Sequence, residues 1–254
     1  MRISRLFSET VPAEHLSLAE KDAMYSLLAE NYEHVNRQSF EADLFEKDCA
    51  ILLRDAQDRS LRGFSTQKVM RFRVEGRRLR AVFSGDTIIA RSHWGEQELG
   101  RAWSQFVAEL RAEEPGIPLY WFLISKGYRT YLFLPLFFHQ FYPCHDRITP
   151  AREQKILDTL AGIRYPGYYV RESGLIVFPE SHGNLNHQLA EIAPRRLRNP
   201  HVQFFLSKNP GFAQGHELAC VAEISAENMR SYAARMLSEN AGKALPTEPS
   251  ALYA

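Results

Sequence analysis

The 254-residue sequence has few cysteines, almost no net charge and no long hydrophobic run. Its three cysteines are odd in number and far apart, which argues against a disulfide framework and favours a reducing compartment. The net charge of +1 provides no overall field for nucleic acid or an anionic membrane. The uncharged stretch 130–145 is shorter than the roughly 20 residues of a membrane span, and the N-terminus lacks a secretory apolar run. We therefore expect a cytoplasmic protein without a membrane span or a nucleic-acid partner.

The composition is otherwise that of an ordinary globular protein, with 45% hydrophobic and 24% charged residues. The length fits one large domain or two small ones and is ample for a buried core. Basic residues form two short clusters, Arg77-Arg78-Arg80 and Arg195-Arg196-Arg198. Two or three charges bind phosphate weakly on their own, so solvated faces are favoured over phosphate sites.

Hydrophobic periodicity predicts an alternation of helices and strands in the first half of the chain. The helices are expected at 18–34, 39–46 and 95–113, and the strands at 49–54, 61–74, 79–90 and 119–124. The first three strands are joined by polar turns and form an antiparallel meander. The continuous apolar run at 119–124 is typical of a central strand covered on both faces.

An aromatic-rich segment follows, and we expect residues 129–141 to be helical, with a kink at Pro135. Two interpretations stay open: a buried helix, apolar all round, or one wall of a tunnel for an acyl chain. Thr149-Pro150 predicts the start of a helix over 151–163. Strands are expected at 174–178 and 217–224, a short helix between the two Asn-Pro steps, and a last helix from Ser225 to Glu239. The domains predicted are a core over 1–148, a C-terminal extension over 149–240 packed on it, and a disordered tail over 241–254.

The loop His93-Trp94-Gly95-Glu96-Gln97-Glu98-Leu99-Gly100 joins the third meander strand to a helix, and a helix N-terminus is suited to an anionic group. This loop and the element order over 18–145 resemble the GNAT acyltransferase superfamily. The resemblance implies an α+β fold: a mixed sheet with an antiparallel meander plus a splayed parallel pair, flanked by helices, here with a C-terminal α/β extension.

The resemblance also implies a cofactor site between the splayed strands. Backbone N–H groups near Ile88, Ile89 and Ala90 would polarise a thioester, and the loop would hold a pyrophosphate. The cofactor-binding residues implied are Ile88, Ile89, Ala90, Trp94, Gly95, Gly100 and Ser125. The loop departs from the family pattern, because Glu98 replaces its middle glycine and Gly95 replaces an Arg or Gln. Glu96 and Glu98 would repel a pyrophosphate.

Three side chains are candidates for catalysis. Asp86 interrupts an apolar strand and would act as the base that takes a proton from an attacking amine; the alternative is a β-bulge at Gly85 with Asp86 capping a turn. His93 could be a base near neutral pH, or bond to the backbone. The resemblance also implies a tyrosine that protonates the leaving thiolate: Tyr128, Tyr131 and Tyr142 are the candidates, and we select Tyr128. The family position lies closest to Phe137 or Phe138, which lack a hydroxyl.

Other groups are weaker candidates. Cys144-His145-Asp146 would serve a hydrolase only if the fold brought the thiol and imidazole together. His182 and His187 lack companions for a metal set, so no metal site is predicted. The sequence thus predicts transfer of an acyl group, of medium or long chain, from acyl-CoA or an acyl carrier protein thioester to a small-molecule amine. The alternative is a non-catalytic GNAT-like module that binds a small ligand or a protein partner.

Overall fold

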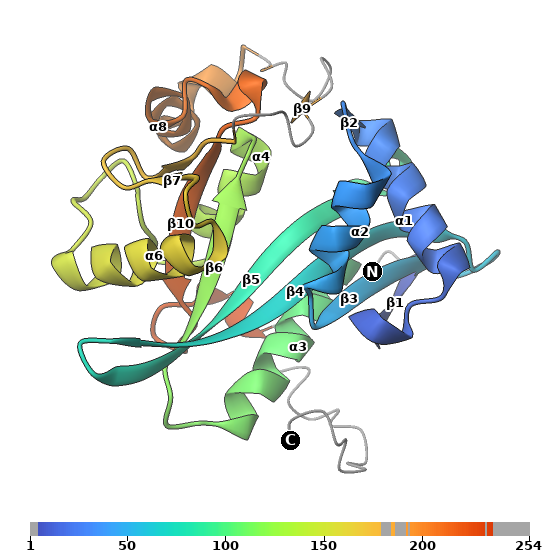
Figure 1. Cartoon of the computed structure of the whole chain (residues 1–254), viewed down its shortest axis with the longest axis horizontal. Helices are drawn as coiled ribbons and strands as arrows, with labels where there is room; N and C mark the ends of the chain where they lie inside the picture. Colours follow the sequence, from blue (N-terminus) through green and yellow to red (C-terminus); the bar gives the residue numbers. More distant parts are fainter. Residues whose placement is uncertain (1–4, 179–183, 186–191, 193, 232, 236–254) are drawn as a thin grey trace.

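One eight-stranded mixed sheet organises the molecule (Figure 1). The computed structural model describes residues 5–178, 184–185, 192, 194–231 and 233–235. In spatial order the strands are β1 (Leu6–Pro12), β3 (Cys49–Asp55), β4 (Leu61–Val74), β5 (Arg77–Ile89), β6 (Leu119–Ser125), β10 (Glu217–Glu223), β8 (Leu175–Ile176) and β7 (Tyr169–Val170). A second, two-stranded sheet pairs β2 (Tyr32–Glu33) with β9 (Asn184–Leu185).

Helices cover both faces of the large sheet. The helices are α1 (Leu18–Asn31), α2 (Arg37–Phe45), α3 (Glu98–Glu113), α4 (Tyr128–Tyr131), α5 (Phe133–Phe137), α6 (Ala151–Arg164) and α8 (Pro200–Lys208), with 3-10 turns at Ala13–His15, Arg91–His93, Arg196–Arg198 and Phe212–Gln214. The alternation of side chains along β3 shows the layering: Ala50 and Leu52 pack in the cluster under α1 and α2, and Ile51 and Leu53 pack in the cluster under α3.

The parallel pair β5–β6 is the feature that positions the site. Its register runs from Arg80 opposite Leu119 to Ser84 opposite Leu123. Beyond that point β5 stays paired with β4, whereas β6 stays paired with β10 as far as Ser125. The two strands diverge above this point in Figure 1. The meander and the splayed parallel pair expected from the sequence are therefore confirmed.

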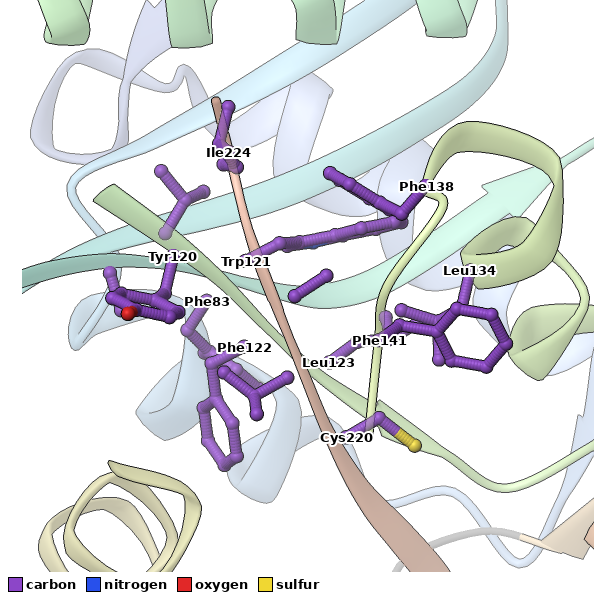
Figure 2. Packing of buried hydrophobic residues seen from close by; sticks show 14 of the residues in the cluster. Phe83, Tyr120, Trp121, Phe122, Leu123, Leu134, Phe138, Phe141, Cys220 and Ile224 are labelled. Carbon is purple, nitrogen blue, oxygen red and sulfur yellow. The ribbon is translucent and has the colours of Figure 1, made fainter. Parts of the chain in front are cut away.

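The core on either side of β6 is aromatic (Figure 2). Trp121 lies 4.7 Å from Trp103 of α3 and 5.9 Å from Phe138, between ring centroids. Phe122 points to the other face, where its ring centroid lies 5.6 Å from that of Phe83. Both faces of β6 are buried, as the continuous apolar run predicts.

The aromatic-rich segment does not form one helix. It breaks into α4 and α5, and Phe138 already has an extended backbone. Phe138 and Tyr142 form bridges to Met229 and Val221, because this stretch lies beside β10 rather than continuing around a helix axis. Most of its rings pack in the core, but Phe133 and Leu136 are exposed, so the segment is not the buried, all-round apolar helix of the first interpretation. The second interpretation, a wall of an acyl tunnel, stays a prediction.

Several boundaries also differ from those expected. Strand β1 was missed and pairs along all of β3. Helix α1 ends at Asn31 and the chain then enters β2, where its backbone pairs with β9. Helix α6 begins at Ala151, after Pro150, and the Thr149 side chain does not cap it. The Ser225 hydroxyl accepts from the Asn228 N–H in a turn, so the expected last helix does not begin there; helical residues appear only from 231, at 231 and 233–235 of the described residues.

Other expectations for the C-terminal half are confirmed. The Asn199 side chain caps α8 between the Asn-Pro steps, and β10 covers the expected strand. Since β10 pairs with β6, residues beyond 148 complete the sheet of the core; the domain boundary itself stays a prediction. The tail 241–254 lies outside the described residues. No helix that the structure describes is long and apolar enough to cross a membrane.

Candidate functional site

A β-bulge at Gly85-Asp86 sits where β5 leaves β6. Ser65 pairs with Thr87 and Gln67 pairs with Ser84, so two residues of β5 stand opposite Thr66 alone. Only glycine fits at the first of these positions, because a Cβ on Gly85 would lie 2.6 Å from the Thr66 Oγ1 and 2.7 Å from the Lys47 Cε. A bulge bends its strand and re-aims a side chain. Here it accompanies the divergence of β5 from β6.

The Asp86 carboxyl is partly buried among charges of both signs. The pKa of Asp86 is raised from 3.8 to about 6, with burial as the largest cause. The neighbouring carboxylates of Asp43 and Glu217 also raise this pKa, and the ammonium groups of Lys47 and Lys126 lower it. A carboxyl with a pKa of about 6 is mostly ionised near pH 7, so it can accept a proton, and it releases that proton again more readily than a strong base would.

Lys47 is the most buried charge of this group. Its side chain is fully buried, and its ammonium group donates to the Asp43 carboxylate and to the Asp43 carbonyl oxygen at 3.1 Å. Burial lowers the pKa of Lys47, and the adjacent Arg164 lowers it too. Arg164 also bonds Asp43, at 2.5 Å. The Asp43 carboxylate therefore joins two cations beneath the bulge.

A second ion pair approaches Asp86 from β6 and β10. The Lys126 ammonium lies 3.4 Å from the Glu217 carboxylate and 5.4 Å from the centre of the Tyr32 ring. Burial raises the pKa of the Tyr32 phenol, helped by the charges of Asp86 and Glu217. Tyr165, at the end of α6, has its pKa raised by burial and by Glu217 in the same way. We refer to the charged side chains Asp43, Lys47, Asp86, Lys126, Arg164 and Glu217 as the Asp86 cluster.

A chain of hydrogen bonds fixes the strands around the bulge. The Trp121 Nε1–H donates to Ser84 at 2.9 Å, and the Ser84 hydroxyl donates to the Gln67 carbonyl oxygen at 2.8 Å. The Gln67 amide donates to the Ser65 Oγ at 2.7 Å, and that hydroxyl is bonded to Thr87 at 2.7 Å. Buried polar networks whose members are all bonded hold a local geometry firmly. This one links the core at β6 to the residue directly after Asp86.

The backbone N–H groups predicted to polarise a thioester are not equivalent. The Ala90 N–H donates to the Arg62 carbonyl oxygen of β4 at 2.7 Å. Successive N–H groups of a strand point in opposite directions, so the Ile88 N–H also points toward β4 and the Ile89 N–H points away from it. In agreement, the Ile89 carbonyl oxygen accepts from the Trp94 Nε1–H at 2.8 Å. Of the three, Ile89 presents its N–H toward the diverging side of β5.

The loop before α3 is tied to the N-terminal strand by its carboxylates. Glu96 accepts from the Arg5 backbone and guanidinium at 3.2 and 3.3 Å, and Glu98 accepts from Ser8 at 2.8 Å. Gly95 has a φ of +90°, which favours glycine. No side chain caps the helix, and Gly100 lies in its first turn. The first N–H groups of α3 are thus uncapped, but two acids stand beside them.

The remaining predicted site residues lie in different surroundings. His93 is buried and turned away from the bulge: its Nδ1 bonds Ser92 at 2.8 Å and its Nε2 lies 3.7 Å from the Asp55 carboxylate. Trp94 is half exposed, and the guanidinium of Arg129 lies 5.9 Å from its ring centre.

The same guanidinium lies 5.1 Å from the ring of Tyr128, so Arg129 links the loop to the helix that follows β6. Tyr128 and Ser125 are both buried, Tyr128 at the start of α4 and Ser125 at the end of β6. Phe137 and Phe138 pack in the core.

The Cys144-His145-Asp146 run does not form a nucleophile–base pair. The Cys144 thiol donates to Asp146 at 3.2 Å, and its pKa is raised to about 11 by burial and by that carboxylate. The His145 ring stacks edge-on against His201, 4.4 Å between centroids. A thiol held protonated in this way is a poor nucleophile. His182 and His187 lie outside the described residues.

Most of the Asp86 cluster was missed from the sequence. Lys47 follows α2, and Lys126 and Glu217 stand at the adjoining ends of β6 and β10. For Lys126 the sequence offered a signal, because a charged residue directly follows the buried apolar strand that ends at Ser125. No local pattern marks Lys47 or Glu217.

No protein-family model matches the sequence, and a comparison with curated proteins gives no match. Among solved structures, the chain is similar to a conserved Enterococcus faecalis protein described as a probable N-acyltransferase, with a TM-score of 0.38 and 14% identity over 50% of this chain and 31% of that one. It is also similar to the Escherichia coli GNAT family N-acetyltransferase YhbS in complex with CoA (TM-score 0.34, 15% identity, 50% and 66% covered). A third is the Saccharomyces cerevisiae N-myristoyltransferase with bound myristoyl-CoA, with a TM-score of 0.37 and 11% identity over 49% of this chain and 30% of that one.

These matches are distant and span about half of this chain, and less than two thirds of each of those three proteins. The topology of the chain is GNAT-like in its own right: strand, two helices, antiparallel meander, helix, parallel strand and helix, with the parallel pair separating at a bulge. The activity has to be argued from the residues at that bulge.

Proposed function

We propose that the protein transfers an acyl group from a thioester to an amine at the point where β5 and β6 diverge. The observation that carries this proposal is Asp86, a partly buried carboxyl on a bulge whose pKa is raised to about 6. A general base works best when its pKa lies near the pH at which the enzyme operates.

In the proposed step, the amine nitrogen attacks the thioester carbonyl carbon while Asp86 takes a proton from that nitrogen. The carbon–sulfur bond breaks, the amide forms and the sulfur leaves as a thiolate that gains a proton. The Ile89 N–H would bond the carbonyl oxygen as negative charge develops on it. Tyr128 is the proposed proton donor to the thiolate, because it begins the helix after β6 beside Arg129.

The acceptor is proposed to attack as a neutral amine, because an ammonium nitrogen has no lone pair and Asp86 takes up a single proton in the step. The charges around Asp86 do not select a cation: Asp43 is paired with Lys47 and Arg164, and Glu217 is paired with Lys126, whose ammonium also lies over the Tyr32 ring. We infer a small primary amine as acceptor.

The donor proposed is acyl-CoA or an acyl carrier protein thioester, held by Ile89, Trp94 and the first turn of α3, with Gly95 and Gly100 allowing close approach. The Glu96 carboxylate accepts a hydrogen bond from Arg5, just before β1, and the Glu98 carboxylate accepts one from Ser8 of β1. These bonds compensate part of the negative charge at the loop. A carrier-protein thioester would not require this acidic loop to hold the pyrophosphate of coenzyme A. Either donor would be available to a protein in the cytoplasm. The chain length of the acyl group stays open between medium and long.

The experiment is a thermal-shift panel followed by turnover. Coenzyme A, acetyl-, octanoyl- and palmitoyl-CoA and acylated carrier protein are compared, since a ligand of the native state raises the melting temperature. Thiol release is then measured with a set of primary amines. We expect at least one thioester to stabilise the protein and to be consumed only when an amine is present. No shift and no thiol release with any donor contradicts the proposal.

One observation favours the alternative of a non-catalytic module. The positions closest to the acid of the GNAT superfamily hold Phe137 and Phe138, both buried in the core. If a thioester binds and is not consumed, and Tyr128→Phe leaves its affinity unchanged, the binding module is the better description.

A further inference from the structure

Four arginines share one face of the β4–β5 hairpin, at the opposite end of β5 from Asp86. Arg71 pairs with Arg80 across the two strands, and Arg73 pairs with Arg78. Because side chains alternate along a strand, all four lie on the same face, while Phe72, Val74 and Leu79 are buried on the other. We call these four residues the arginine face. Like charges directly opposite each other destabilise a sheet.

A single carboxylate stands among these arginines. Glu114, just beyond the end of α3, lies 3.3 Å from the guanidinium groups of Arg71, Arg78 and Arg80. Arg73 donates instead to the Gly76 carbonyl oxygen at 2.8 Å. The four arginines and Glu114 line a cavity of about 390 Å³ together with three apolar residues. The charged groups of its lining, four cations and one anion, sum formally to +3.

Arg80 is the least exposed of the four arginines. Its side chain is only 1% exposed; its Nη1 faces Glu114 and its Nη2 donates to the Glu114 carbonyl oxygen at 3.0 Å. The Arg80 Nε–H is buried without a hydrogen-bond partner. A buried cation is costly unless it is paired and its donors are satisfied. Arg80 shares its one carboxylate partner with two other arginines and keeps one unbonded N–H, so its buried charge is only partly compensated.

We propose that the arginine face is a binding site for a phosphate-type oxyanion, such as the phosphoryl or diphosphate group of a small molecule. Guanidinium groups bind phosphate oxygens in a bidentate manner, and Arg71, Arg73 and Arg78 are exposed at the cavity. A multivalent anion would relieve the repulsion between the cross-strand pairs. Since Arg80 and Asp86 are six residues apart along an extended strand, roughly 20 Å, the site is separate from the proposed thioester site.

The test uses inorganic pyrophosphate as the probe, at constant ionic strength adjusted with sodium chloride. We expect saturating pyrophosphate to raise the melting temperature of the full chain by about 2–4 °C. The double variant Arg73→Gln/Arg78→Gln should lose most of this shift. The matched control is Arg195→Gln/Arg198→Gln, which removes the same charge from the exposed second basic cluster and should keep the shift. Inorganic phosphate and ADP, run beside pyrophosphate, distinguish a monophosphate from a diphosphate ligand.

Glu114→Gln provides a second measurement. Glu114 competes with an added anion for the same guanidinium groups, so its removal should tighten pyrophosphate binding several-fold in a calorimetric titration and should lower the melting temperature of the free protein. The proposal is overturned if Arg73→Gln/Arg78→Gln binds pyrophosphate as tightly as the unmodified protein, or if Glu114→Gln weakens that binding. Neither result bears on thioester binding, which is measured separately.

Discussion

The two ends of strand β5 both gather charged side chains, but they balance those charges differently. At the splayed end, three carboxylates (Asp43, Asp86 and Glu217) face three cations (Lys47, Lys126 and Arg164) in a partly buried cluster drawn from several elements. At the hairpin end, four arginines share one face with the single carboxylate Glu114, which contacts three of them, and three of the four arginines are exposed.

This difference indicates different chemistry. Where the two signs are balanced and buried, burial and the neighbouring charges shift pKa values, as they do for Asp86 and Lys47. Where exposed arginines dominate, the side chains stay charged near neutral pH, and their excess positive charge attracts an anion. We therefore assign proton transfer to the first end and anion binding to the second. Four variants test this comparison, in order of decreasing effect.

Asp86→Asn is expected to have the largest effect, a loss of turnover of roughly 10²–10⁴-fold, because the proposed base is removed. Stability should change in the opposite direction. The pKa of Asp86 is about 6 in the folded chain against 3.8 in the unfolded one, so ionised Asp86 destabilises the fold above pH 6 and this penalty is lost as the pH falls toward 4. At pH 7.5 the variant should gain up to about 3 kcal/mol in the free energy of unfolding.

Chemical denaturation at pH 7.5 and pH 4 measures this gain, which should shrink at the lower pH. The control is Glu172→Gln, an equal change of charge at an exposed turn. Unchanged turnover in Asp86→Asn removes this residue from the mechanism.

Lys47→Met sharpens the assignment of proton transfer. Lys47 lowers the pKa of Asp86, so its removal should shift the acid limb of the pH–rate profile to higher pH. It also leaves Asp43 with Arg164 as its remaining close cation, and we expect a loss of about 1–3 kcal/mol in stability. A pH–rate profile that keeps its midpoint while stability falls shows that Lys47 is purely structural.

Glu96→Gln/Glu98→Gln tests the mouth of the proposed thioester site. Glu96 and Glu98 stand beside the helix N-terminus proposed to receive the pyrophosphate and repel it, so removing both charges should tighten coenzyme A binding on the order of tenfold. The contacts to Arg5 and Ser8 weaken at the same time, and the melting temperature should fall. Calorimetric titration with coenzyme A gives the affinity. Weaker binding in this variant means that the two acids do not oppose the cofactor.

Arg73→Gln/Arg78→Gln has the smallest expected effect on stability. Without an added anion it relieves the repulsion of cross-strand arginines and should gain about 0.2–1 kcal/mol. The gain should shrink in high salt, which screens charges at the surface. Denaturation at low and high sodium chloride measures it. A loss of stability, or a gain that does not depend on salt, contradicts the picture of an unbalanced arginine face.

Much of the fold was predictable because it depends on local patterns. Alternating or continuous apolar runs marked the meander and β6, and Ser84-Gly85-Asp86-Thr87 stood out as a polar interruption of β5. The bulge of one interpretation exists, and the role of Asp86 as a base, which was the other, stays a prediction. The aromatic segment was mispredicted because its apolar residues are buried by β10, a strand some 80 residues later, rather than by their own helix.

The sequence by itself determined the strands of the meander and β6, the turns between them, and the acidic loop that opens α3, because these depend on hydrophobic period, glycine and proline within short windows. Only the tertiary structure decided what surrounds each charge. Lys47, Lys126 and Glu217 meet near Asp86, and Arg71 faces Arg80, through strand register and sheet order. Electrostatic interactions depend on distance and burial in space, and separation along the chain specifies neither.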